Sequence, residues 1–521
     1  MNNSQFEQYK NIPKDKFKFV NEVNLHDQKL NTKPMSYFKD AMFRFAKNKA
    51  SIVGAIIISI LILYSIIVPI FSPFEVADRD GWYTNTLPKV SFLEGTGFWD
   101  GTSREEISQQ DYDYYNAIEQ EIGRNVVDVI EKKISIDANF NLVTKYDVRI
   151  DSYSKVGMVF DLLTSEEYLA IQEYQTQNNV QILYPMYNAD IKNNTNDEFM
   201  ALDANYWFIH NAKNGAAIYD ENGQYQKRYL SYTGSDNYNS IRVADDAKAL
   251  EETGTPLYNY AKKMQGGTYY CRYDYYEYFK YMNNGTEPVF VFGTNGQGQD
   301  LFVCLASGAR FSLLLAVFIS VINLTIGTIY GAIEGYYGGA TDLVMERILD
   351  IIAGIPFMIV VTLFKLHLVD KNIVGPIESL LFAFVLTGWT GMASSVRSQF
   401  YRYKHREYVL AARTLGARDA RLIFKHILPN SLGTLITGCV LVIPGVIFSE
   451  SSLSYLGIVN LETAGITSVG TLLSQGEGSF TSFPHIILFP ALFISLLEIS
   501  FNLFGNGLRD AFNPSLRGTE E

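Results

Sequence analysis

Hydrophobic segments divide the chain into a membrane-like part and a polar part. Residues 52–70 form an uncharged apolar run of about the length that crosses a bilayer. From residue 292 onward the chain is again mostly apolar, and it predicts five further spans, at 308–332, 343–366, 379–397, 430–450 and 483–505. No run between residues 72 and 290 is long and apolar enough to span. The pattern predicts an α-helical polytopic membrane protein with six transmembrane helices and an insert between helices 1 and 2.

The insert shows both helix-like and strand-like patterns. Segments rich in Val, Ile, Tyr and Phe predict strands at 145–150, 181–184, 206–209 and 289–292. Thr164 and Glu167 have the spacing of a capping box, which predicts a helix through Gln175. The length is sufficient for one globular α+β domain. The aromatic run at 269–281 is either a stacking surface for a ligand or, the favoured interpretation, an element packed on its own domain.

Charge predicts the orientation of these segments. The tail at residues 1–49 holds ten Lys and Arg against five acids, and Lys47 and Lys49 directly precede the first span. Residues 75–288 hold 34 acids against 19 bases. The loop at 397–425 has eight bases and two acids, whereas the loop at 451–482 has two acids and no base. Because basic loops stay in the cytosol, both termini are expected inside and the insert outside.

The remaining composition argues against several classes of protein. Three cysteines, Cys271, Cys304 and Cys439, are too few for a disulfide framework, although a pairing of Cys271 with Cys304 stays open. The chain has no HExxH motif, no Walker A motif and no acid–base constellation, so we expect no enzyme and no metal site. A cleavable signal peptide is not expected, because the first apolar run begins only near residue 50.

Residues 407–429 (EYVLAARTLGARDARLIFKHILP) form the most informative stretch. Residues 407–415 predict a short helix, and Gly416 ends it because glycine adopts left-handed backbone angles easily. A second short helix follows, with Leu422, Ile423 and Phe424 as its apolar positions. Pro429 suits the first turn of the next helix. The result is an exposed helical segment between two spans, of the kind that lies in a groove on a partner.

At these residues the chain resembles the signature loop of ABC importer permeases. Ala411, Ala412, Gly416, Leu428 and Pro429 fall on the family pattern in register. Leu410 replaces the usual Glu and His426 replaces the usual Ile, although His before Ile-Leu-Pro-Asn resembles the peptide branch of that family.

Further motifs resemble the C-type subunit of oligopeptide and dipeptide permeases over residues 292–514 and the first span. Before the second span the matching residues are Gly293, Thr294, Gly298 and Asp300; after it they are Gly338, Gly339, Asp342, Arg347, Asp350 and Pro356; near the C-terminus they are Asn502, Gly505, Arg509 and Asp510. Arg347 and Asp350 lie three apart on one helix face and are expected to pair, as surface anchors or within an internal network.

The resemblance implies a type I ABC importer permease fold and a pore-forming subunit for oligopeptides. It implies a sister permease, two cytosolic ABC ATPases that carry ATP and Mg, an extracytoplasmic substrate-binding lipoprotein, membrane lipid and no nucleic acid. The residues expected to couple to an ATPase are Glu407, Tyr408, Ala411, Ala412, Arg413, Gly416, Leu428 and Pro429. The expected regions are a cytosolic tail (1–49), helix 1 (50–71), an extracytoplasmic insert (72–290), a permease core (291–507, with a coupling loop at 398–429) and a cytosolic tail (508–521).

Two alternatives stay open. A permease for nickel or another small solute belongs to the same branch, although the spans hold no His or Met cluster that would mark a metal path. A receptor with residues 75–288 as its sensor domain belongs to another class. The role of the insert is also open: it could dock the lipoprotein, cap the pore or hold the sister permease.

Overall fold

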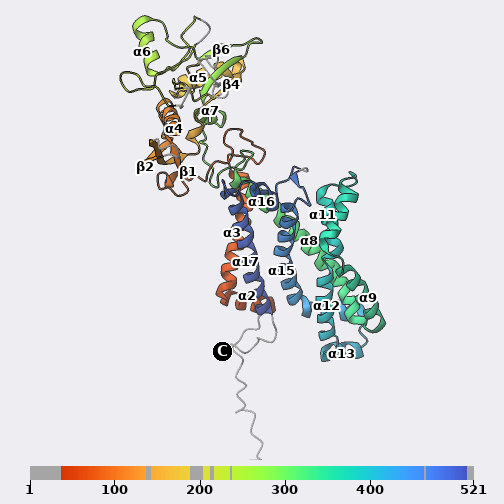
Figure 1. Ribbon diagram of the computed structural model, residues 1–521. Coiled ribbons are helices and arrows are strands. Elements are labelled where there is room, and N and C mark those ends of the chain that lie inside the picture. Colours follow the sequence, from red (N-terminus) through yellow and green to blue (C-terminus); the bar gives the residue numbers. More distant parts are fainter. Residues whose placement is uncertain are drawn as a thin grey trace, which may run out of the picture.

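The computed structural model describes residues 37–136, 142–187, 203–211, 216–234, 238–462 and 465–512. A bundle of long helices carries a mixed α/β domain at one end (Figure 1). Residues 1–36 of the N-terminal tail and residues 513–521 of the C-terminal tail lie outside the described residues.

Five helical segments are long and apolar enough to cross a membrane. Three of them are single helices: α3 (Lys49–Phe71), α8 (Leu301–Tyr337) and α17 (His485–Phe512). The segment Pro376–Tyr403 consists of α11 (Pro376–Thr387) and α12 (Thr390–Tyr403). The segment Asp419–Tyr455 begins with α14 (Asp419–Arg421) and ends with α15 (Leu428–Tyr455). Predicted spans one, two, four, five and six fall on these segments.

The predicted span at 343–366 is a bent pair of helices. Helix α9 (Gly339–Ala353) and the segment Phe357–Val369, which begins with α10 (Phe357–Phe364), meet at an angle of 69°. Pro356 precedes α10, and a proline at this point both lacks an N–H and disfavours helical angles in the residue before it. The described chain therefore has five candidate spans, or six if the bent pair counts as one.

Close backbone contact holds the bundle together between α8 and α12. Gly327, Gly331 and Gly335 recur every fourth residue along the face of α8 that packs on α12. A Cβ at Gly327 would lie 2.7 Å from the Met392 side chain, and one at Gly331 would overlap the Ala393 carbonyl. Small residues at this spacing let two membrane helices approach closely.

Three short helices complete the bundle: α2 (Tyr37–Lys47), α13 (Glu407–Thr414) and α16 (Val469–Glu477). In α16, Val469 and Leu472 are fully buried, and Gly470 lies against the backbone of Ser451. The loop between the last two spans thus packs against protein through α16.

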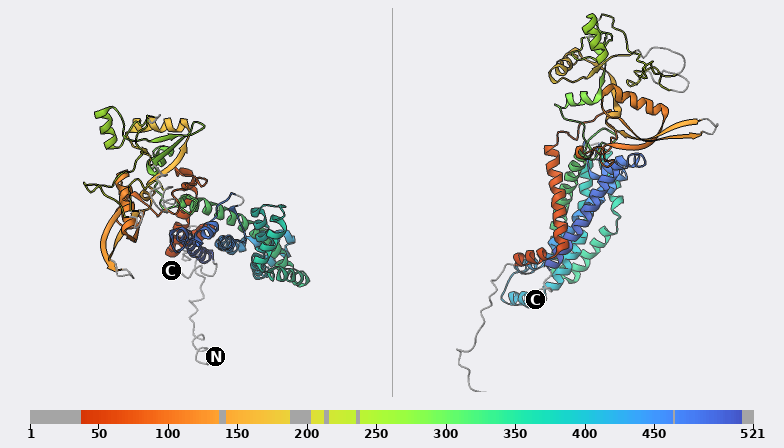
Figure 2. Two further views of the ribbon diagram at one scale, coloured as in Figure 1. Left: turned by 45° about the horizontal axis from the view of Figure 1, so that its top comes forward. Right: turned by 90° about the vertical axis from the view of Figure 1, so that its left-hand side faces the viewer.

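The insert contains two antiparallel sheets. The first has the order β1 (Thr102–Ser108), β3 (Leu142–Asp151), β2 (Val127–Ile136), and α4 (Gln109–Ile122) connects β1 to β2. In the second, β7 (Tyr269–Asp274) pairs with β4 (Met158–Leu163), β5 (Leu183–Tyr184) and β6 (Ala261–Lys263). Helices α5 (Ser165–Asn178), α6 (Ala244–Thr253) and α7 (Tyr275–Met282) complete it. Figure 2 shows β2 and β3 reaching away from the helix bundle.

The strand predictions succeed only in part. Residues 145–150 lie within β3, and residues 181–184 contribute only the two-residue strand β5. Residues 206–209 form isolated bridges, such as Phe208 with Lys227, and residues 289–292 form no strand. The last two predictions are wrong because aromatic residues there fill cores instead: Phe208 and Phe290 are almost fully buried. Strand propensity reports packing as much as backbone preference.

Other predictions for the insert are confirmed. The capping box of Thr164 and Glu167 opens α5, which continues to Asn178. The aromatic run at 269–281 forms β7 and α7, and Tyr273 and Tyr275 are buried in the domain core. Cys271 and Cys304 are both buried and unpaired, so the open question of their disulfide is answered in the negative.

Candidate functional site

Residues 407–429 lie at the end of the bundle opposite the insert (Figure 1). Helix α13 follows α12 and ends before Gly416, whose φ of +82° is left-handed as predicted. Helix α14 continues into a π-helical turn at Leu422–Ile427, and Pro429 lies in the first turn of α15. The predicted first short helix and the glycine turn are therefore present, whereas the predicted second short helix is the beginning of the continuous helical segment Asp419–Tyr455.

The inner face of this segment is anchored in the bundle. Val409, Leu422 and Ile427 are fully buried in one hydrophobic cluster with Phe400 of α12 and Tyr336 of α8. Tyr336 also donates a hydrogen bond to the Asp419 carboxylate at 2.5 Å. The segment is thus fixed to the ends of both helices by packing and by a charge-assisted hydrogen bond.

The outer face of the segment exposes apolar side chains. Leu415 is 89% exposed and Phe424 is 65% exposed. Phe424, the third predicted apolar position of the second helix, is not part of the cluster that buries Leu422 and Ile423. Tyr408 and Leu410 are also exposed. Exposed apolar groups gathered on one short segment mark an interaction surface.

The two alanines differ in their surroundings. Ala411 is exposed, whereas Ala412 is partly buried against the anchoring cluster. Arg413, also exposed, donates to the Tyr336 hydroxyl at 3.3 Å. Ala411 is therefore the member of the pair that offers an open approach to a partner.

An ionic cluster links three helices next to this segment. Arg397 of α12 donates to both carboxylate oxygens of Asp342 in α9, at 2.6 and 3.1 Å, and the Tyr401 hydroxyl donates to the same carboxylate. Glu334 of α8 and Glu346 of α9 each lie 3.3 Å from the guanidinium. The Glu334 side chain is fully buried. We refer to these five residues as the Arg397 cluster.

Sequence reasoning identified only Asp342 of this cluster. An ionisable residue inside an apolar helix, such as Glu334, is the signal that could have indicated the remainder. Arg347 and Asp350 do pair, at 2.7 Å, but their side chains are 69% and 52% exposed. Of the two interpretations left open for that pair, the surface one fits the structure.

Family-motif glycines shape the turn between α8 and α9. Gly338 and Gly339 have φ values of +68° and +57°. Lys404 donates to the Gly335 carbonyl at 2.8 Å, which ties the end of α12 to this turn. The turn, the Arg397 cluster and residues 407–429 thus lie at the same end of the bundle.

The outer motif, Gly293 to Asp300, lies at the opposite end and holds the beginning of the insert. A Cβ on Gly293 or Gly298 would overlap the carbonyls of Thr86 and Asp80, respectively, and both glycines have positive φ. Buried Thr294 donates to the Tyr83 carbonyl at 2.6 Å. Asp300 caps α8 through the Phe302 N–H. These contacts with residues 80–86 were not predicted.

The family-motif residues near the C-terminus, Asn502, Gly505, Arg509 and Asp510, lie on α17. Gly505 of α17 lies against Leu441 of α15, where a larger residue would overlap. Asn502 donates to the Glu498 carbonyl at 2.9 Å, while Arg509 and Asp510 are exposed. The structure does not place these residues in contact with residues 407–429.

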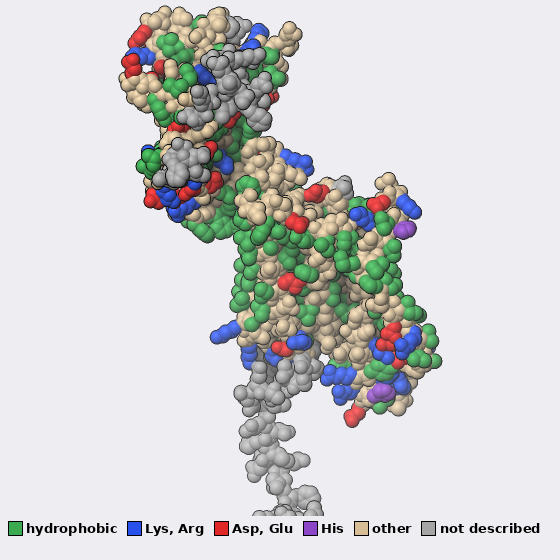
Figure 3. Space-filling model, viewed as in Figure 1, with side chains coloured by type: hydrophobic (Ala, Val, Ile, Leu, Met, Phe, Trp, Pro, Cys, Tyr) green, Lys and Arg blue, Asp and Glu red, His purple; other side chains and the backbone are tan. Residues whose placement is uncertain are grey.

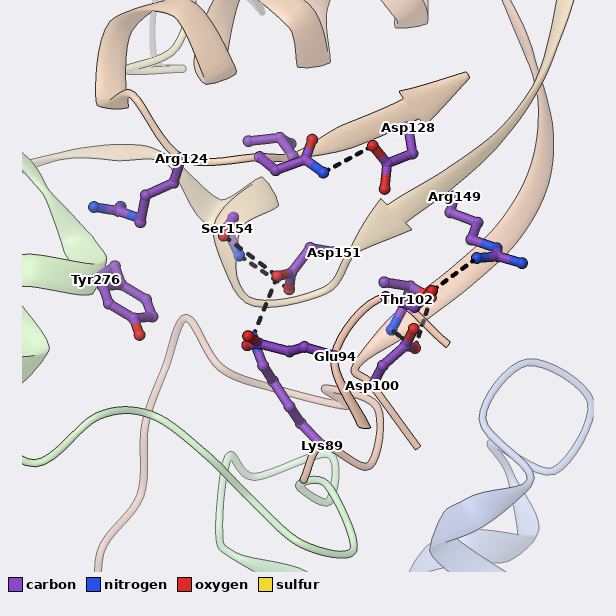
Figure 4. Close-up of a pocket in the computed structure, with 13 residues that line it drawn as sticks. Lys89, Glu94, Asp100, Thr102, Arg124, Asp128, Arg149, Asp151, Ser154 and Tyr276 are labelled. Atoms are coloured by element: carbon purple, nitrogen blue, oxygen red, sulfur yellow. Dashed lines mark hydrogen bonds and ion pairs between the residues drawn. The ribbon is translucent and has the colours of Figure 1, made fainter. Parts of the chain in front are cut away.

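The insert contains a polar cavity of ≈ 320 Å³ (Figure 4). Lys89 pairs there with Glu94 at 3.0 Å and Asp151 at 3.4 Å. Burial alone would lower the pKa of the Lys89 ammonium, but these carboxylates outweigh it and hold that pKa above its ordinary value. Asp100 accepts from the Thr102 hydroxyl at 2.7 Å. Lys89 and its two carboxylates thus satisfy one another on one side of the cavity.

No metal centre is evident in the ranges that the structure describes. Within them, no group of three or more His, Cys, Asp or Glu side chains is placed to hold a metal ion.

Helical spans, the 407–429 segment and the outer motif define a multi-pass membrane permease. The profile of the binding-protein-dependent transport system inner membrane component family matches residues 323–518, and that of the N-terminal TM domain of oligopeptide transport permease C matches residues 36–88. The chain belongs to the family of binding-protein-dependent transport permeases, in its oligopeptide permease C branch.

Curated relatives agree with this assignment. The chain is 42% identical over 226 residues to the oligopeptide transport system permease protein OppC of Bacillus subtilis, which is 43% of this chain and 72% of that protein. It is 41% identical over 229 residues to the dipeptide transport system permease protein DppC of the same organism, covering 43% and 69%. Haemophilus influenzae OppC is 42% identical over 231 residues, covering 44% and 72%.

Among solved structures, an inward-facing MetNI methionine ABC transporter chain is similar with a TM-score of 0.32 and 15% sequence identity. The similarity covers 39% of this chain and 96% of that chain.

Proposed function

We propose that this chain is the pore-forming transmembrane subunit of an ATP-driven ABC importer with the type I permease fold, and that its substrates are oligopeptides. The observation that carries the proposal is the 42% identity to an oligopeptide permease over 72% of its length. In this role the chain is no enzyme itself, and ATP and Mg act in partner subunits.

The proposed partners are a sister permease, two cytosolic ATPases and an extracytoplasmic substrate-binding lipoprotein. Residues 407–429 are the proposed ATPase contact. Support comes from the exposed side chains of Tyr408, Leu410, Leu415 and Phe424, which lie along this segment. Leu410, where the family pattern has Glu, makes this contact more apolar than the pattern implies.

Movement of the ATPases would be transmitted to the membrane spans through the buried inner face of residues 407–429. The segment packs on α8 and α12 and leads directly into α15, so its displacement as a rigid body would move three helices together. The Arg397 cluster adds α9 to this unit. Sliding and hinging of packed helices is a general route between two access states.

The proposed topology has both termini in the cytosol and the insert outside. Its support is the charge asymmetry of the loops, together with the position of the basic 407–429 segment and the acidic insert at opposite ends of the bundle (Figure 1). The family profile extends to residue 88, and residues 80–86 are seated on the outer motif. We therefore place the added domain at about residues 89–290 and assign residues 72–88 to the permease core.

Vesicles containing the whole reconstituted complex test the substrate class. We expect ATP-dependent uptake of a labelled oligopeptide, with excess unlabelled peptide reducing it and excess nickel leaving it unchanged. The matched control is the same vesicle with a non-hydrolysable ATP analogue. Nickel uptake that peptide does not reduce would instead establish the small-solute alternative.

A further inference from the structure

Residues 91–99 of the insert, here called the aromatic loop, expose two large aromatic side chains. Phe92 is 83% exposed and Phe98 is 67% exposed. Gly95 and Gly97 lie between them, each with positive φ. Exposed Phe side chains on a glycine-rich loop do not contribute to the domain core, so they need another explanation.

Trp99 fixes the end of the aromatic loop to the membrane bundle. Its ring lies 5.5 Å from Phe489 and 6.2 Å from Phe292, and those two rings stack on each other at 4.0 Å. The Trp99 indole N–H also donates to the Val291 carbonyl. Phe489 lies in the second turn of α17, which begins at His485. The aromatic loop therefore joins the bundle just inside the end of a candidate span.

The backbone conformation at Trp99 indicates that surrounding contacts hold the end of the aromatic loop in one position. Its φ of +56° is left-handed, which is unfavourable for a bulky side chain. Such a conformation persists only where surrounding contacts determine it, and here they are the ring stack and the indole hydrogen bond. Trp and Tyr are typical of the boundary between lipid headgroups and acyl chains.

Hydrophobic side chains cover the underside of the insert where it overhangs the bundle, level with the upper end of the helices (Figure 3). A cation lies beside the aromatic loop: the Arg149 guanidinium packs against Gly97 and donates to the Gly95 carbonyl at 3.5 Å (Figure 4). Its cross-strand neighbour Arg104 pairs with Asp147, but Arg149 has no ion pair within the described ranges.

We propose that the aromatic loop enters the lipid leaflet on the insert's side of the membrane. Phe92 and Phe98 lie at the headgroup–acyl boundary, and Arg149 binds a lipid phosphate. Lipid is the occupant that fits, because the loop continues the apolar belt of α17 through Trp99 and its exposed aromatic groups lie beside the cation of Arg149 on β3. Amphipathic surface elements bind membranes in this way. The insert would thereby be held at two places, by its chain connections and by lipid.

Spin-label accessibility in the full reconstituted complex tests the proposal. Single cysteines replace Phe92 or Phe98 after Cys271, Cys304 and Cys439 are changed to alanine, and each carries a nitroxide label. The matched control is Leu169→Cys on α5, a 63% exposed site in the upper part of the same domain. In phosphatidylglycerol vesicles, we expect the ratio of oxygen to water-soluble nickel-chelate accessibility to be at least about threefold higher at 92 and 98 than at 169.

Two results would overturn the proposal. A ratio at 92 and 98 equal to that at 169 would place the loop in water. Loss of accessibility to both reagents would show that a partner protein covers it.

Arg149→Glu should lower the ratio at 98 in phosphatidylglycerol while leaving the ratio at 169 unchanged. An unaltered ratio at 98 would show that Arg149 does not contact lipid.

Discussion

Replacing Gly416 by valine is expected to reduce ATP-dependent peptide uptake by about tenfold or more while the complex still assembles. A Cβ at this position would meet no atom within 4 Å, so space is not the obstacle. The obstacle is the φ of +82°, since left-handed angles cost an L-residue about 1–2 kcal/mol and a β-branched residue more. Valine would change the angle between α13 and α14 and displace the exposed face from its partner.

Gly416→Asn is the matched control for that change. Asparagine adopts left-handed angles more readily than other side-chain-bearing residues, so uptake should stay within about twofold of wild type. Uptake is measured in reconstituted vesicles, with the ATPase rate followed in parallel. If the valine variant imports at the wild-type rate, residues 407–429 do not couple transport to ATP.

Arg397→Ala is expected to destabilise the bundle by about 3 kcal/mol, the lower end of the range for breaking a buried ion pair. The lower end applies because the Arg397 side chain is 26% exposed. Without the Arg397 guanidinium, the fully buried Glu334 carboxylate lies beside those of Asp342 and Glu346 and has lost its ion-pair partner. The measurement is the midpoint of unfolding of the detergent-solubilised protein, followed by tryptophan fluorescence.

The double variant Arg397→Ala/Glu334→Gln separates charge from packing. Removing the buried carboxylate should recover part of the lost stability, because the uncompensated charge is then gone. If the double variant is as unstable as the sum of the two single variants, the Arg397–Glu334 pair carries no coupling energy and the account of the cluster is wrong.

Predictions from sequence succeeded where local chemistry determines structure. Apolar runs located the spans, and Gly416 marked the end of α13 because its left-handed backbone preference acts locally. The same logic found the capping box of Thr164 and Glu167. The bend at Pro356 and the ionisable Glu334 inside α8 were local signals in the spans that the predictions did not use.

What escaped prediction depends on neighbours that are distant in sequence. The Arg397 cluster needs α8, α9 and α12 side by side, and the fit of Gly298 against Asp80 needs two segments more than 200 residues apart. The failed strand at 289–292 shows the same limit, since the burial of Phe290 among distant aromatic residues decides its conformation.

Capture of the partner ATPase by the solubilised permease tests most directly whether residues 407–429 form the coupling contact. Ala411→Trp places a large ring on the exposed face without entering the anchoring cluster. Ala340→Trp is the matched control, at an exposed alanine on α9 near the same end of the bundle. The account predicts that the ATPase co-purifies with wild type and Ala340→Trp but is lost from Ala411→Trp. Equal recovery of the ATPase with all three proteins would contradict it.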